Sequence, residues 1–134
     1  SKLNREELKL ISRLKIPLEK ITHMSGSDDK LANLYAHANC LVYPSYYEGF
    51  GLPPLEAMLE KCPVVVSNRS SIPEVVGEAG EYFDPSSVES IADSIEKVLY
   101  DKYYTDELIK KGLIQASKFT WEKCAEKTLE VYKK

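Results

Sequence analysis

Two short, unbroken apolar runs constrain the fold of this chain most strongly. The first is CLVY at residues 40–43, and the second is PVVVS at residues 63–67. Neither run alternates apolar with polar residues, which is typical of strands that are buried on both faces of a parallel sheet. Between them lie a glycine-containing loop and a helix expected from about residue 53 to residue 61. The order strand, loop, helix, strand predicts a βαβ unit.

The N-terminal segment predicts two helices and a strand. Asn4 followed by Glu7 is a capping-box pattern, and Pro17 ends the helix that this pattern begins. Residues 20–24 (KITHM) are expected to form a short strand. Ser27 is expected to cap the next helix, whose apolar positions recur at helical spacing.

The C-terminal half predicts one more strand and three helices. Residues 81–83 (EYF) are the strand, and residues 88–99 carry the apolar pattern of an amphipathic helix. Thr105 and Thr120 are expected to begin two further helices, with Trp121 packed in the core. The fold class is therefore α/β: a partial Rossmann-like parallel sheet of about four strands flanked by helices, with a helical C-terminal tail.

Composition excludes several classes of protein. A chain of 134 residues is long enough for one domain with a core and too short for two ordinary domains. The 21 acidic residues outnumber the 18 basic ones, so we expect no nucleic-acid partner. No apolar run approaches the roughly 20 residues that span a bilayer. Cys40, Cys62 and Cys124 form no C-x-x-C pair, and we expect free thiols, no metal cofactor and a cytoplasmic location.

The loop SYYEGFGLPPLEAM (45–58) follows the first apolar run, at the carboxyl end of the expected strand. Ligands of open parallel sheets collect at this end. Gly49 and Gly51 allow positive φ and a close approach of the backbone to a ligand. Pro53 and Pro54 suit the first turn of the following helix, whose positive end then faces the loop. The pattern predicts a site for a phosphate or a sugar hydroxyl, although an ordinary strand-to-helix turn has the same local sequence.

Two glutamates flank this loop, Glu48 on the loop and Glu56 near the start of the helix. An ionised carboxylate only accepts hydrogen bonds, which suits a ribose diol or the hydroxyls of a hexose. Two carboxylates beside a diphosphate repel it unless a cation intervenes. Lys61 and Arg69 are the nearest cations in the sequence. The plain alternative is that both glutamates are solvated surface residues.

Three segments together resemble one enzyme family. They are EGFGLPPLEAM (48–58), PVVVSNRSSIPEVVGEAGEYFDP (63–85) and KFTWEKCAEKTLEVY (118–132). From about Ile21 to its C-terminus the chain resembles the C-terminal, donor-binding domain of glycosyltransferase family 4 (group 1), whose members are retaining, metal-independent enzymes of GT-B fold. By this resemblance Glu48 contacts hydroxyls of the donor sugar, the N–H groups of residues 49–52 (Gly49, Phe50, Gly51, Leu52) hold sugar and phosphate oxygens, and Glu56 binds the ribose hydroxyls. Glu48 is then the catalytic residue. It would act either as a nucleophile or as a group that positions the donor, and we prefer the second role.

The resemblance also indicates what to expect beyond these residues. In the family an Arg and a Lys neutralise the leaving diphosphate, and they precede the region that this chain covers. We therefore expect residues 1–134 to be a single partial nucleotide-sugar-binding domain, a fragment inactive alone, without its N-terminal acceptor-binding domain. The complete enzyme is expected to move a hexosyl group to a glycan, lipid-linked or small-molecule acceptor. Peripheral membrane association of the whole enzyme and self-association of the fragment both stay open.

Two lesser contacts are assigned, each with a plain alternative. His23 ends the expected strand at residues 20–24 and would approach the nucleobase, but a lone histidine is more often structural. Arg69 follows the PVVVS strand and would face the phosphates, but it also suits an exposed surface. Two other functions also fit the motif, a non-catalytic nucleotide- or phosphate-binding module and an interaction domain.

Overall fold

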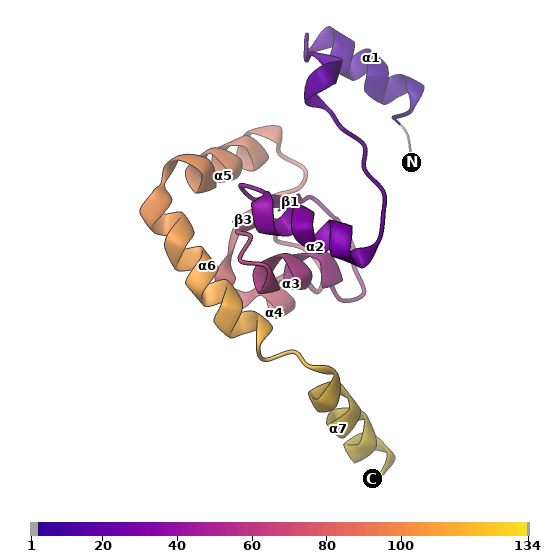
Figure 1. Ribbon diagram of the computed structural model, residues 1–134, viewed down its shortest axis with the longest axis vertical. Coiled ribbons are helices and arrows are strands. Elements are labelled where there is room, and N and C mark those ends of the chain that lie inside the picture. Colours follow the sequence, from indigo (N-terminus) through magenta and orange to yellow (C-terminus); the bar gives the residue numbers. More distant parts are fainter. Residues whose placement is uncertain (1–2, 134) are drawn as a thin grey trace.

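The computed structural model describes residues 3–133, which contain a three-stranded parallel sheet (Figure 1). Its strands, in spatial order, are β1 (Leu41–Tyr43), β2 (Val64–Ser67) and β3 (Gly80–Phe83). Every residue of the central strand β2 is buried. The two apolar runs therefore predicted β1, β2 and their parallel pairing correctly.

Helices cover both faces of this sheet, and two further helices extend away from it at opposite ends (Figure 1). Those that pack around the sheet are α2 (Asp28–His37), α3 (Leu52–Leu59), α4 (Ile72–Val76), α5 (Val88–Tyr100) and α6 (Lys102–Ala116). Those that extend away are α1 (Arg5–Arg13) and α7 (Trp121–Tyr132), and two single turns of 3-10 helix are η1 (Leu18–Lys20) and η2 (Gly77–Ala79). The α/β fold class with helices flanking a parallel sheet is confirmed.

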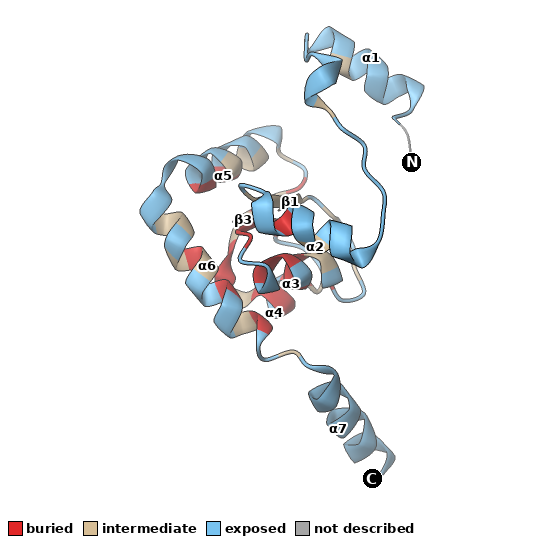
Figure 2. Ribbon diagram, in the orientation of Figure 1, coloured by how far each residue is buried: buried red, intermediate tan, exposed pale blue. Residues whose placement is uncertain are grey.

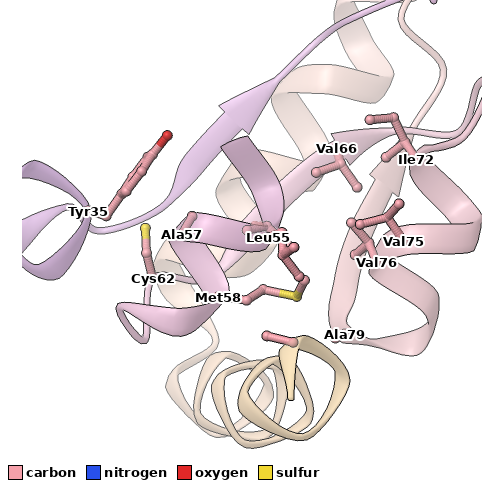
Figure 3. Close-up of a cluster of buried hydrophobic side chains, with 12 residues drawn as sticks. Tyr35, Leu55, Ala57, Met58, Cys62, Val66, Ile72, Val75, Val76 and Ala79 are labelled. Carbon is pink, nitrogen blue, oxygen red and sulfur yellow. The ribbon is translucent and has the colours of Figure 1, made fainter. Parts of the chain in front are cut away.

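The core has one cluster on each face of the sheet because side chains of β2 alternate between the faces. Val64 and Val66 point into the larger cluster, which α2, α3 and α4 complete. Figure 3 shows Met58 at its centre, and α6 passes close over this side chain at Gly112. Val65 points to the other face, into a smaller cluster formed with β3, α5 and α6.

Helix α1 begins as the capping box predicts. The Asn4 side chain accepts hydrogen bonds from the backbone N–H groups of Glu6 and Glu7, and the Glu7 carboxylate accepts one from the N–H of Asn4 at 2.6 Å. Neither α1 nor α7 buries any residue, and both are drawn as exposed or half-buried along their whole length in Figure 2. These two helices are therefore held by local interactions and not by the core.

The prediction of a strand at residues 20–24 is wrong, and the sheet of the described residues has three strands instead of about four. Residues 21–27 have no regular structure. Lys20 is the last residue of η1, and the Ile21 N–H donates to the Leu18 carbonyl of the same turn. No strand among residues 3–133 pairs with this segment, so its backbone does not enter a ladder.

Two smaller expectations in the C-terminal half are also wrong. Helix α6 begins at Lys102 and not at Thr105, because the Asp101 carboxylate accepts a hydrogen bond from the N–H of Tyr104 at 2.9 Å. Trp121 is 82% exposed and not packed in the core, because α7 has no helix or strand of the sheet region against it. Thr120 does cap α7, as expected.

Candidate functional site

The Gly-Phe-Gly loop (residues 44–51) leaves the carboxyl end of β1 and leads into α3. Gly51 lies at the N-terminal end of α3 with φ of 105°, a conformation that favours glycine, and it is buried. A Cβ atom here would lie 3.1 Å from the Ile72 Cδ1 atom. The fold itself therefore requires glycine at position 51.

Gly49 is different, because nothing in the fold requires it. Its φ is outside the positive range, its surface is exposed, and no heavy atom lies within 4 Å of a Cβ atom placed there. The space beside Gly49 is therefore free for another molecule to approach the backbone closely.

The backbone N–H groups of residues 49–52 donate no hydrogen bond within the part of the chain that the structure describes. Pro53 and Pro54 follow in the first turn of α3 and have no N–H group. Four consecutive donors are thus unused at the positive end of a helix, which is an arrangement suited to phosphate or hydroxyl oxygens.

Glu48 is held by a residue that sequence reasoning missed. The Tyr43 hydroxyl, at the end of β1, donates a hydrogen bond of 2.6 Å to the Glu48 Oε1 atom. This bond, with a smaller contribution from the Ser45 side chain, lowers the pKa of Glu48. Burial and the Glu48 carboxylate raise the pKa of Tyr43 to about 12, so this hydroxyl stays a donor. Tyr43 thus engages one oxygen of Glu48, and among the hydrogen bonds of residues 3–133 no donor bonds to the other.

Glu56 lies on the second turn of α3, is exposed, and lies close enough to Tyr35 to influence its pKa. Burial raises the pKa of Tyr35, on α2, and the negative charge of Glu56 raises it further. Figure 3 shows Tyr35 at the edge of the larger core cluster. Tyr35 and Tyr43 fit the apolar patterns of a helix and a strand, so nothing local to them in the sequence marked their hydroxyls as partners of the two glutamates.

Ser70 and Ser71, here called the serine pair, connect the Gly-Phe-Gly loop to the segment that follows β2. The Ser70 hydroxyl donates to the Glu48 carbonyl at 2.9 Å and accepts from the Glu48 N–H at 3.3 Å. The Ser71 hydroxyl lies 3.0 Å from the Glu48 carbonyl and 2.9 Å from that of Phe50. Sequence reasoning missed this pair as well, because bonds between the ends of two strands require the tertiary fold.

The two lesser candidates are not brought into this cluster by any hydrogen bond or ion pair within residues 3–133. His23 lies in the irregular segment between η1 and α2, so the strand that was expected to position it does not exist. Arg69 forms an ion pair with Asp84 on an exposed surface, with Nη2 at 3.3 Å from Oδ1. Arg69 nevertheless lies two residues after the end of β2, immediately before the serine pair.

The loop lies on an open surface of the chain. Two surface hollows of about 230 and 290 Å³ are lined by other residues, one between η2 and α6 and one around the start of α2. Across residues 3–133, no three histidine, cysteine or carboxylate side chains gather as a group able to hold a metal ion. Of the helices described, none combines the length and the hydropathy needed to cross a membrane.

Comparisons with known proteins point to one family. The family model described as glycosyl transferases group 1 matches residues 2–115. O-antigen chain mannosyltransferase B of Escherichia coli is 49% identical over 106 residues, covering 79% of this chain and 28% of that protein. MMP alpha-(1->4)-mannosyltransferase of Mycolicibacterium hassiacum is 37% identical over 132 residues, covering 94% of this chain and 32% of that protein.

A solved structure agrees with these relatives. Sucrose-phosphate synthase from Thermosynechococcus elongatus superposes with a TM-score of 0.84 at 30% identity, and the match covers 96% of this chain and 33% of that one. The chain thus spans about a third or less of the length of the relatives named here.

Proposed function

This chain belongs to the group 1 glycosyl transferases, and on that premise we propose that it is the donor-binding part of a retaining, metal-independent hexosyltransferase. The observation that carries the proposal is the row of four unused N–H groups at residues 49–52, flanked by the Glu48 and Glu56 carboxylates. The N–H groups hold phosphate and sugar oxygens of a nucleotide-sugar. The carboxylates accept from its hydroxyl groups.

Each glutamate has its own role in this proposal. Glu48 contacts hydroxyls of the donor sugar with the carboxylate oxygen that Tyr43 leaves free. Glu56, just over one turn into α3, binds the ribose hydroxyls. The anomeric carbon then loses its bond to the diphosphate and gains one to an acceptor oxygen, whose proton passes to the leaving phosphate or to water. Positioning and stabilisation of the leaving group supply the rate, and no metal is needed in this scheme.

Mannose is the sugar that we propose for the donor. Two relatives are named as mannosyltransferases, and one of them as an enzyme of the O-antigen chain. We extend this to a role of the whole protein in polysaccharide biosynthesis. The three cysteines are free thiols, which fits a reducing compartment, and we place the protein in the cytoplasm.

Catalysis in this proposal requires groups beyond those described here. No lysine or arginine side chain bonds to the Gly-Phe-Gly loop within residues 3–133, so neutralisation of the leaving diphosphate falls to other residues of the whole enzyme. An acceptor-binding domain completes the site. The unused N–H groups also fit a second candidate function, a non-catalytic module that binds nucleotides or phosphate.

The test is ligand-observed NMR of this chain against UDP-, GDP- and ADP-sugars, repeated with Glu56→Ala. Glu60→Ala is the matched control, because Glu60 is exposed just beyond the other end of α3. We expect binding of one base class that Glu56→Ala abolishes and Glu60→Ala leaves unchanged. Equal binding by all three proteins would refute the assignment of Glu56 to the ribose. Equal binding of a nucleotide diphosphate with and without its sugar would favour the non-catalytic module.

A further inference from the structure

Resting on the function proposed above, we propose that the serine pair (Ser70 and Ser71) positions the donor-binding backbone. Its hydroxyl groups hold the carbonyls of the Gly-Phe-Gly loop on one side, so that the loop's N–H groups point to the other side, toward the donor. Ser70 has a positive φ, which is unfavourable for a residue other than glycine, and its hydroxyl bonds to the backbone of Glu48 in this conformation.

The direction of the N–H groups follows from the geometry of the peptide bond. Each peptide unit is planar, and in the trans form its C=O and N–H groups point in opposite directions. The described residues contain no cis peptide bond. The Glu48 carbonyl faces both serine hydroxyls, so the N–H of Gly49, in the same peptide unit, points away from them. The Phe50 carbonyl faces Ser71, so the N–H of Gly51 also points away.

The N–H groups of Gly49 and Gly51 therefore both point away from the serine pair. The Ser71 hydroxyl lies within hydrogen-bond distance of both carbonyls. This one group therefore restrains the orientations of the two peptide units relative to each other. Gly49 has no side chain, and no heavy atom lies within 4 Å of a Cβ atom placed there, so the space beside its backbone is open. Donors that are fixed before binding lose little conformational entropy when an oxygen arrives.

The backbone of Ser70 supports the same inference. Three residues other than glycine have positive φ among those described: Lys15, Lys61 and Ser70. Lys15 and Lys61 each lie two residues after the last residue of a helix, where a left-handed residue is common. Ser70 has φ of 54° and ends no helix, since it lies between β2 and α4.

Glycine would take this conformation at no steric cost, yet the position holds serine. What serine adds is the hydroxyl, and this hydroxyl bonds to both the N–H and the carbonyl of Glu48. A strained residue with such bonds beside a candidate site is a reason to propose a role in that site.

The experiment compares Ser70→Gly with Lys61→Gly in this chain. Both changes relieve positive φ, but Lys61 lies at the end of α3 remote from the loop. Three quantities are measured: the thermal midpoint, the affinity for GDP-mannose, and the 15N relaxation of the Gly49 and Gly51 amides. Ser71→Ala and Ser71→Thr form a second pair, because threonine keeps the hydroxyl group.

We expect Ser70→Gly to keep or raise the thermal midpoint, to increase the mobility of both amides, and to weaken GDP-mannose binding roughly fivefold, the effect of about one hydrogen bond. Lys61→Gly should raise the midpoint and change nothing else, and Ser71→Thr should retain what Ser71→Ala loses. Unchanged amide mobility in Ser70→Gly would overturn the proposal, and so would increased mobility with unchanged affinity. If the wild-type chain binds no GDP-mannose, the donor assignment fails, while the relaxation data still decide whether the serine pair fixes the loop.

Discussion

Replacing Gly49 by alanine separates what the fold requires of the loop from what a ligand requires. A Cβ atom at Gly49 meets no heavy atom within 4 Å, and the backbone does not have positive φ there. Alanine reduces the conformational freedom of the unfolded chain, so we expect Gly49→Ala to be neutral or to stabilise the fold by up to about 1 kcal/mol. Donor binding should fall at least about tenfold, or 1.4 kcal/mol, because the new methyl group blocks a close approach to the backbone.

Gly51→Ala is the comparison. Alanine at φ of 105° is strained by roughly 1–2 kcal/mol, and its Cβ would lie 3.1 Å from the Ile72 side chain, which must shift slightly. The two variants should therefore differ in stability by about 2 kcal/mol although they lie two residues apart.

Urea unfolding followed by far-ultraviolet circular dichroism measures these differences. Fluorescence of Trp121, the single tryptophan, is a poor probe because this side chain is already 82% exposed. Affinity is measured by titration with the nucleotide-sugar. Our reasoning would be refuted if Gly49→Ala destabilised the fold as much as Gly51→Ala, or if it left donor affinity unchanged.

Three further predictions follow from the fold and the loop. Tyr43→Phe removes the bond that lowers the pKa of Glu48, so carboxyl-carbon NMR should show a higher pKa for Glu48. Because the pKa of Glu48 is lower in the folded protein than in the unfolded chain, the Tyr43 bond stabilises the fold above the unfolded pKa, and this stability is lost as the pH falls. Tyr43→Phe should therefore be less stable than the wild type at neutral pH, and the difference should shrink in acid. A difference that does not depend on pH would contradict this. Met58→Ala should cost about 2–5 kcal/mol in urea unfolding, because Met58 is 2% exposed at the centre of the larger core cluster, and a cost below 1 kcal/mol would be too small for a residue so placed. Deleting residues 121–134 should leave the free energy of unfolding of the remainder unchanged, because α7 buries no residue, and a clear loss would show that α7 packs on the core.

The parts of the fold that the sequence predicted are those with a strong local pattern. Residues 40–43 and 63–67 are short apolar runs that do not alternate with polar residues, which favours strands of a parallel sheet. Of the two strands, β2 is buried along its whole length and β1 is half-buried. The Asn4 and Glu7 pair specifies a helix start without reference to the rest of the chain. Residues 20–24 mix apolar residues with Lys20, Thr22 and His23, and no strand within residues 3–133 pairs with them.

The candidate site was predicted in part for the same reason. The Gly-Phe-Gly loop with its two glutamates is a contiguous motif, and its place after a strand and before a helix was correctly predicted. The serine pair reaches the loop through the pairing of β1 with β2, and Tyr35 reaches Glu56 through the packing of α2 on α3. These contacts join residues that are distant in sequence and have no local signature. Tyr43 is only five residues from Glu48, but it fits the apolar pattern of β1, which does not mark its hydroxyl as a partner.

The most direct test of donor binding at the loop is an amide-shift titration of the 15N-labelled chain with GDP-mannose and the other nucleotide-sugars. We expect the amide signals of Gly49, Phe50, Gly51 and Leu52 to move first and furthest, because their N–H groups are the unused donors. Shifts that cluster instead around the hollow at the start of α2 or the one beside α6, with residues 49–52 unmoved, would contradict it.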